Sequence, residues 1–222
     1  MQRLALITGG ARGIGTAIRT ELEQRGCRVV APSRSELDLG NPDSVDAYLH
    51  SHADLPVDIL INNAGINILN AIPDIDATTW QAMLQVNLTA ALRLIQAFAP
   101  GMASRGWGRI LSMSSILSVV TRDRRAAYSM TKAALNALTR STAVEFGPSN
   151  VLANALAPGY VDTALTHQNN TPDMLKALEA TIPLRRLARA EELAKAAAFL
   201  VSEENSYLTG QTLVVDGGFT CQ

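Results

Sequence analysis

Short apolar runs alternate along the chain with longer segments in which apolar residues recur every three or four positions. The runs are Arg3–Thr8, Cys27–Ala31, Val57–Asn62, the stretch containing Ile110, Leu111 and Met113, Val151–Ala157 and Gln211–Asp216. Runs without polar alternation are typical of strands that are buried on both faces of a parallel sheet. The pattern therefore predicts a sheet covered by helices on each side.

The segments between the runs have helical periodicity. Helices are predicted after the glycine turn at residues 8–15, after Asn41-Pro42-Asp43, and over Thr78–Ser104, Ala126–Glu145, Met174–Ala180 and Glu191–Val201. Strands that alternate with helices indicate a doubly wound α/β fold, a three-layer sandwich around a mainly parallel sheet. No linker or internal repeat interrupts the chain, so residues 1–222 are expected to form one dinucleotide-binding domain.

One step departs from a regular doubly wound fold. Only Pro32–Leu37 separates the second run from Asp38-Leu39, whereas a helical crossover needs a dozen or more residues. The helix between the second and third strands is therefore predicted to be missing. The third strand should be very short, or an extended segment should replace it.

Composition and charge exclude several classes of protein. The formal net charge of −1 offers no electrostatic attraction to nucleic acid or to an anionic membrane, so neither is expected as a partner. No run is apolar enough to suggest a membrane span, and a strand-like run begins near the first residue, so a cytoplasmic protein is expected. Cys27 and Cys221 match no metal spacing, and no metal is expected.

A glycine-rich turn links the first strand to the first helix. Gly9, Gly13 and Gly15 permit unusual backbone dihedrals and let the backbone approach a pyrophosphate, while the helix N-terminus offers free N–H groups. The spacing differs from the common G-x-G-x-x-G pattern. The strand–turn–helix context nevertheless indicates a dinucleotide site.

Two arginines bear on which dinucleotide binds. An NAD site usually has a carboxylate for the ribose hydroxyls after the second strand, but this chain has Ser33 and Arg34 there. Arg12 lies inside the glycine turn, where its charge opposes the positive helix end. Both guanidinium groups could hold a 2′-phosphate, or both could simply be solvated. We favour NADP(H) over NAD(H).

Candidate acid–base chemistry lies between Ser115 and Lys132. Tyr128 and Lys132 are four residues apart and share one helix face, and Ser115 follows the end of a buried run. A phenol has a pKa of about 10. An ammonium about 4 Å away would favour the phenolate by about 4 kcal/mol at an effective dielectric near 20. This pairing predicts that Tyr128 exchanges protons with a carbonyl or alcohol, although such spacing also occurs on ordinary helices.

These segments together resemble the short-chain dehydrogenase/reductase family in its compact, β-ketoacyl-acyl carrier protein reductase-like form. The matching pieces are TGGARGIG at 8–15, NNAG at Asn62–Gly65, Asn87, Ser115, the segment from Tyr128 to Lys132, Pro158-Gly159 and the terminal YLTGQTLVVDGG. Each piece is short, but their order and spacing are specific. The resemblance covers nearly the whole chain and implies a Rossmann-like fold and reduction or oxidation of a small carbonyl or alcohol.

The resemblance also implies roles for individual residues. Tyr128 would exchange the proton, Ser115 would orient the substrate oxygen, Lys132 would bind the nicotinamide ribose, and Asn87 would hold a water of a proton relay. The implied cofactor contacts are Gly9, Ala11, Arg12, Gly13, Ile14, Gly15, Arg34, Asp38, Leu39, Asn63, Ala64, Gly65, Tyr128, Lys132, Pro158, Gly159, Val161 and Thr163. A lid over Thr163–Leu187 and pairing of long helices into a homodimer or homotetramer are implied as well.

Near the substrate side, one feature differs from the family pattern and a second has several interpretations. Ser118 stands where related reductases often have glycine. Arg122, Arg124 and Arg125 make the following loop basic, which suits a substrate carboxylate or phosphate, a solvated loop or a subunit contact. The alternative to an enzyme is a catalytically silent dinucleotide-binding regulator, which we would expect to have lost Ser115, Tyr128 or Lys132.

Overall fold

The computed structural model describes residues 2–168 and 170–222. Its sheet has six strands in the order β2-β1-β3-β4-β5-β6, and every neighbouring pair is parallel. The strands are β1 (Leu4–Ile7), β2 (Arg28–Val30), β3 (Ile59–Asn62), β4 (Gly108–Met113), β5 (Val151–Pro158) and β6 (Thr212–Val215). Each strand coincides with one of the predicted apolar runs.

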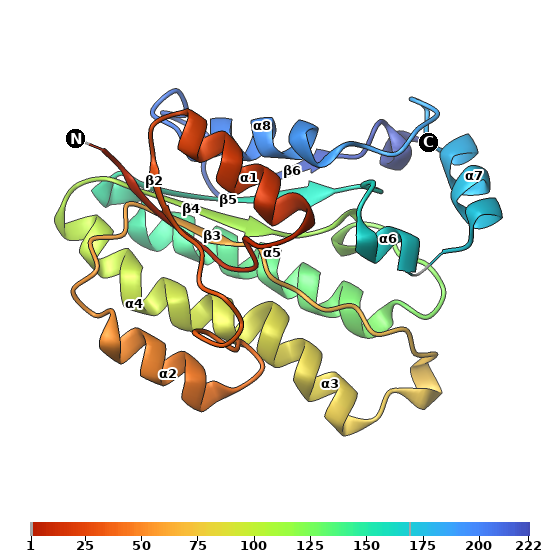
Figure 1. The fold of residues 1–222 in the computed structure, drawn as a ribbon, viewed down its shortest axis with the longest axis horizontal. Helices are drawn as coiled ribbons and strands as arrows, with labels where there is room; N and C mark the ends of the chain where they lie inside the picture. The colour runs from red at the N-terminus through yellow and green to blue at the C-terminus, as the bar shows by residue number, and fades with distance from the viewer. Residues whose placement is uncertain (1, 169) are drawn as a thin grey trace.

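The described residues form eight α-helices, most of which lie in two layers around this sheet (Figure 1). They are α1 (Gly13–Gln24), α2 (Pro42–Ser51), α3 (Ala77–Leu84), α4 (Ala90–Ser104), α5 (Ala126–Phe146), α6 (Ala164–Gln168), α7 (Pro172–Thr181) and α8 (Ala190–Leu200). One buried cluster joins α1 and α8 to one face, and another joins α2, α4 and α5 to the other face. The predicted three-layer, Rossmann-like α/β sandwich is therefore confirmed.

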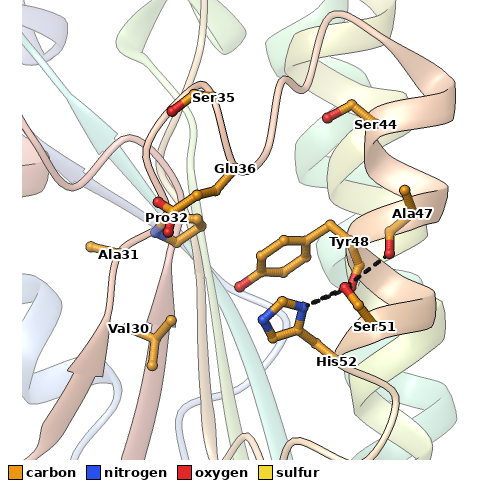
Figure 2. Close-up of a pocket in the computed structure, with 10 residues that line it drawn as sticks. All are labelled: Val30, Ala31, Pro32, Ser35, Glu36, Ser44, Ala47, Tyr48, Ser51 and His52. Carbon is orange, nitrogen blue, oxygen red and sulfur yellow. Dashed lines mark hydrogen bonds between the residues drawn. The ribbon is translucent and has the colours of Figure 1, made fainter.

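The shortened connection after β2 is confirmed too. Residues 31–41 form neither helix nor strand; they make a turn after Ser33 and then an extended stretch that buries Leu37 and Leu39. Asn41 caps α2 by accepting a hydrogen bond from the Asp43 N–H. The edge of β2 thus faces a groove of about 620 Å³, which α2 borders on the other side (Figure 2). The groove occupies the side of β2 where a further strand would pair.

The long helical run over Ala77–Ser104 contains a π turn that the sequence pattern does not predict. Residues Gln85–Thr89 form this turn between α3 and α4, and Asn87 is buried within it. The run is long and apolar enough to cross a membrane by length and composition, contrary to the expectation from the sequence. Its buried side chains, among them Leu94 and Phe98, pack in the cluster on the sheet.

Candidate active site

The carboxyl ends of β1 and β3 meet where the strand order reverses, the usual ligand position in an open α/β sheet. Thr8 directly follows β1, and its hydroxyl accepts the N–H groups of Asn63 and Ala64 at 3.0 and 3.1 Å. The Asn63 amide donates to the carbonyls of Thr8 and Gly9 at 2.9 and 3.2 Å. These bonds bring the predicted Asn63–Gly65 segment against the glycine turn. Sequence reasoning did not single out Thr8, although it directly precedes that turn.

The glycine turn is too tightly packed for larger residues. Gly9 and Gly13 have φ values of +66° and +54°, which favour glycine. A Cβ atom at Gly15 would lie 2.2 Å from the carbonyl oxygen of Gly9. Arg12 precedes α1, where no side chain caps the helix and no acidic residue occupies the first turn. The N–H groups at this helix start are therefore available to an anion.

The segment after β2 is more open. The Arg34 side chain is 86% exposed and lies 3.4 Å from the Asp38 carboxylate. Asp38 also accepts the Gly40 N–H, whereas Leu39 is buried and its carbonyl accepts a hydrogen bond from Gln85. Arg12 and Arg34 form no ion pair or hydrogen bond with each other in the described residues. The predicted pair is thus present as two separate, exposed guanidinium groups.

The π turn positions Asn87 against the loop after β3. The Asn87 amide oxygen accepts the Ile66 N–H at 2.8 Å, and its nitrogen donates to the Ile66 carbonyl and the Thr131 hydroxyl. Both amide hydrogens are therefore used within the protein. Thr131, which sequence reasoning missed, lies beside Lys132 in the matched Tyr128–Lys132 segment and ties α5 to this turn.

Lys132 is buried close to Tyr128 at the start of α5. Its ammonium donates to the carbonyl of Met113, the last residue of β4, at 2.6 Å. The Lys132 nitrogen lies 5.6 Å from the centre of the Tyr128 ring. A Cβ atom at Gly65 would lie 3.4 Å from the same nitrogen. The predicted residues of β4, α5 and the loop after β3 thus meet around this ammonium.

The electrostatics of this pair differ from the sequence-based expectation. Burial raises the pKa of Tyr128 to about 12, and the Ser115 hydroxyl and the charge of Arg125 only partly oppose that rise. Burial also lowers the pKa of Lys132 to about 8. The expected shift of the Tyr128 pKa to near neutrality is therefore not reached.

Ser115 and Ser118 are held in one short 3-10 turn after β4. The Ser115 hydroxyl accepts the Leu117 N–H at 3.1 Å. The Ser118 hydroxyl donates to the Ser115 carbonyl at 2.6 Å and accepts a hydrogen bond from the Asn136 amide at 2.9 Å. The departure from glycine at Ser118 thus adds two bonds that anchor the Ser115 loop to α5.

The segment after β5 closes the opposite side. Gly159 approaches β6 so closely that a Cβ atom there would lie 2.7 Å from the Asp216 Cα. Val161 forms a parallel bridge with Ala188. The Thr163 methyl group lies 3.5 Å from where a Gly13 Cβ would be. Thr163 therefore lies next to the glycine turn. Pro158 is the last residue of β5, and Gly159 and Val161 lie between it and Thr163 in the chain. Within the predicted lid, Asn169 lies outside the described residues.

No cluster of histidine, cysteine, aspartate or glutamate side chains suited to a metal ion occurs in residues 2–168 and 170–222. The chemistry that the described residues present is a buried ammonium, a phenol and hydroxyl groups beside a glycine turn. This set suits proton exchange with an oxygen atom next to a bound dinucleotide.

Comparisons with known proteins agree with this geometry. A family model described as Enoyl-(Acyl carrier protein) reductase matches residues 34–220. The 3-oxoacyl-acyl-carrier-protein reductase of Vibrio cholerae is 35% identical, and the match covers 97% of this chain and 96% of that protein. The acetoacetyl-CoA reductase of Allochromatium vinosum is 34% identical, with 98% of each chain covered.

A solved structure extends the likeness to three dimensions. It is a gluconate 5-dehydrogenase from Burkholderia cenocepacia in complex with NADP and tartrate. The TM-score is 0.94 at 31% identity, and the match covers 100% of this chain and 97% of that one. The chain belongs to the short-chain dehydrogenase/reductase family of NAD(P)-dependent oxidoreductases, which act on CH–OH and C=O groups.

Proposed function

We propose that this protein is an NADP(H)-dependent oxidoreductase that interconverts a carbonyl and a secondary alcohol, with Tyr128 as the acid and base. The single observation that carries the proposal is the position of the buried Lys132 ammonium. It lies beside the Tyr128 ring, on the carbonyl that ends β4, and against the loop after β3. Burying a cation costs free energy, and buried ionisable groups with shifted pKa values cluster at functional sites.

The four catalytic roles follow from these contacts. The cofactor supplies or receives the hydride. Tyr128 donates its proton to the substrate oxygen in reduction, and the Lys132 ammonium stabilises the phenolate that remains. Ser115, whose hydroxyl lowers the pKa of Tyr128, orients the same oxygen. Because both Asn87 amide hydrogens are occupied, we assign a relay water to the backbone of the π turn or to the remaining Asn87 oxygen lone pair.

The pKa directions favour reduction at neutral pH. Tyr128 has a raised pKa and is therefore a neutral proton donor well above pH 7. Oxidation would need the phenolate as a base, which the surroundings disfavour before the cofactor binds. We therefore expect faster turnover of ketones than of alcohols near neutrality.

The proposed cofactor contacts divide into two groups. Gly9, Ala11, Arg12, Gly13, Ile14 and Gly15 would surround the pyrophosphate at the start of α1. Asn63, Ala64, Gly65, Pro158, Gly159, Val161 and Thr163 would border the nicotinamide half, with Tyr128 and Lys132 at its ribose. Arg34 would contact the 2′-phosphate, and Asp38 and Leu39 the adenosine. Preference for NADP(H) over NAD(H) rests on the exposed Arg34 guanidinium and on the absence of a carboxylate at Ser33.

The relatives suggest the range of substrates, since they are named as a 3-oxoacyl-acyl-carrier-protein reductase, an acetoacetyl-CoA reductase and a gluconate 5-dehydrogenase. A small-molecule carbonyl compound or alcohol is the proposed substrate. A single domain over residues 1–222, a homodimer or homotetramer and a cytoplasmic location complete the proposal. The alternative of a catalytically silent dinucleotide-binding regulator gains no support, because Ser115, Tyr128 and Lys132 are all retained.

The direct experiment is a screen of ketones and aldehydes with NADPH and with NADH, in which the absorbance of the reduced nicotinamide is measured over time. The proposal expects consumption of NADPH with at least one carbonyl compound and slower consumption of NADH. Tyr128→Phe serves as the paired variant and should show no consumption. Turnover that survives in Tyr128→Phe would contradict the assigned proton donor.

A further inference from the structure

Three arginines lie in the loop between the Ser115 turn and α5, and they have no acidic partner. Arg122, Arg124 and Arg125 are absent from the ion pairs formed by the described residues. Arginines 12, 28, 109, 140 and 185 also form none there, but they are scattered along the chain, whereas these three share one short loop. Asp123, within the same loop, forms none with them. This is an uncompensated group of cations beside the proposed proton donor.

Arg125 is the member of the group closest to the chemistry. It is the residue before α5 and precedes Tyr128 by three positions in the chain. Its charge acts on the Tyr128 hydroxyl. It is half-buried, and no hydrogen bond from its guanidinium group is formed within the described residues. The five N–H donors of this guanidinium are therefore available to a ligand.

Arg122 reinforces the positive field from the other side. Its Nη1 donates to the Tyr160 hydroxyl at 2.9 Å, and its guanidinium lies 5.8 Å from the centre of that ring. Tyr160 follows β5 and packs edge-on against Phe219. Burial and the nearby charge of Arg122 both lower the pKa of Arg125. Two cations this close together without a carboxylate repel each other, and an anion between them would relieve that repulsion.

We infer that Arg125, supported by Arg122, binds an oxoanion of the substrate and makes this protein selective for carbonyl compounds that carry a carboxylate or phosphate a few bonds from the reacting carbon. The inference rests on the proposed function, because it places the anion next to the oxygen that Tyr128 protonates. Arg125 precedes Tyr128 by three positions and its charge acts on the Tyr128 hydroxyl, so the anion is expected within a few bonds of the reacting carbon. The planar guanidinium fork matches such an oxoanion.

The test uses matched pairs of charged and neutral substrates. The keto acids pyruvate, acetoacetate, levulinate and 5-oxohexanoate are each compared with their methyl esters, and dihydroxyacetone phosphate with dihydroxyacetone. A charge-assisted hydrogen bond predicts a kcat/KM for the best anion about tenfold or more above that of its neutral partner. A preference for the phosphate pair over the acid pairs would assign the anion as phosphate, and the reverse as carboxylate.

Variants separate Arg125 from general effects of charge. Arg125→Gln removes no cap from α5, because the arginine side chain makes none. It should reduce the preference for the anion to nearly one, chiefly through KM for the anion. The rate with the ester should change only through the loss of the Arg125 charge near the Tyr128 hydroxyl. Arg125→Lys should keep part of the preference. Arg140→Gln, an exposed arginine on the same helix without an ion pair in the described residues, should keep all of it.

Two results would overturn the inference. The first is equal or faster turnover of the neutral compounds by the unchanged protein, which would leave the proposed function standing. The second is a preference for the anion that Arg125→Gln does not alter. If no compound turns over, the proposed function fails, and calorimetric titration of the NADP⁺-loaded protein with the keto acids tests the anion site separately. Binding that Arg125→Gln abolishes would support the anion site. Absence of binding would overturn the inference as well as the proposed function.

Discussion

The centre of the sheet and its β2 edge both meet the proposed cofactor crevice, but they are built differently. At the centre, Thr8, Asn63 and Gly15 are held by hydrogen bonds and by close backbone packing. At the edge, residues 31–41 run as a turn and an extended segment, with Arg34 almost fully exposed and an open groove alongside (Figure 2). The residues at the centre are held in fixed positions, whereas the edge presents an exposed, charged side chain.

This difference indicates which parts of the fold tolerate amino-acid substitution. The close contacts of Gly15 and Lys132 come from Gly9, Asn63 and Met113 rather than from the shortened segment 31–41. Selectivity for one dinucleotide can therefore depend on exposed residues at the edge while the chemistry depends on buried ones. Changes at the centre should have large effects, and changes at the edge small ones.

The largest expected effect is that of Tyr128→Phe, at the centre. Removing the phenolic hydroxyl deletes the proposed proton donor, so kcat should fall about a thousandfold. Binding of NADPH, measured by fluorescence titration, should stay nearly unchanged because the ring remains. Tyr207→Phe, at a tyrosine that is 96% exposed, is the control and should leave kcat unchanged.

Gly15→Ala should destabilise the centre. The new Cβ would lie 2.2 Å from the Gly9 carbonyl oxygen and 2.6 Å from the Asn63 amide nitrogen. Overpacking of this kind lowers the free energy of unfolding by about 3 kcal/mol, measured by urea denaturation. Gly147→Ala is the control, since φ there is −53° and no atom lies within 4 Å of the added Cβ. Equal effects of the two substitutions would contradict the packing described for the turn.

Lys132→Met should abolish turnover and yet stabilise the fold. Burial lowers the pKa of Lys132 from 10.5 to about 8, so the charged form destabilises the folded state at neutral pH. Removing it should raise the free energy of unfolding at pH 7 by about 3 kcal/mol. Between about pH 8 and 10.5 the unfolded state holds the proton that the folded state has lost, so the stability of the unchanged protein rises with pH. The difference in the free energy of unfolding between Lys132→Met and the unchanged protein should therefore become smaller over that pH range.

Arg34→Ala tests the edge. Loss of a guanidinium that binds a 2′-phosphate should weaken NADP⁺ binding about tenfold, while NAD⁺ binding stays nearly constant. Calorimetry gives both dissociation constants. Arg19→Ala is matched to it, because Arg19 also pairs with an acidic residue four positions later. An equal loss of affinity for both dinucleotides would remove Arg34 from the phosphate contact.

The smallest expected effect is that of Tyr48→Phe, in the groove beside β2. The Tyr48 side chain is buried, and its hydroxyl has no hydrogen-bond partner in the described residues. Because an unpaired buried hydroxyl is unfavourable, its removal should raise the free energy of unfolding by about 1 kcal/mol. Thermal denaturation with Tyr207→Phe as the control measures the difference. A loss of stability would show that this hydroxyl has a partner in solution.

Most of the fold was predictable from patterns that depend on burial alone. The strand through Ile110 and Met113 and the helix over Ala126–Glu145 required only the periodicity of apolar residues. The missing helix after β2 followed from chain length. The π turn at Gln85–Thr89 could not be predicted, because one extra residue in a helical turn leaves the apolar pattern almost unchanged.

The sequence pattern brought the candidate residues Tyr128 and Lys132 together, but it could not predict their electrostatics. The spacing of Tyr128 and Lys132 gave their shared helix face. The bond from Lys132 to the Met113 carbonyl, the distance of 5.6 Å to the Tyr128 ring and the raised pKa of Tyr128 depend on tertiary packing. The contact of Asn87 with Ile66 likewise needs two distant segments to be placed together.

The most direct test of the central claim follows the hydride itself. NADPH carrying deuterium at the transferable position of the nicotinamide is supplied with the best ketone from the carbonyl screen, and the alcohol is examined by mass spectrometry. We expect the alcohol to carry one deuterium on its carbinol carbon with the unchanged protein, and no labelled alcohol above background with Tyr128→Phe. Alcohol formed without deuterium, or labelled equally by both proteins, would contradict the claim.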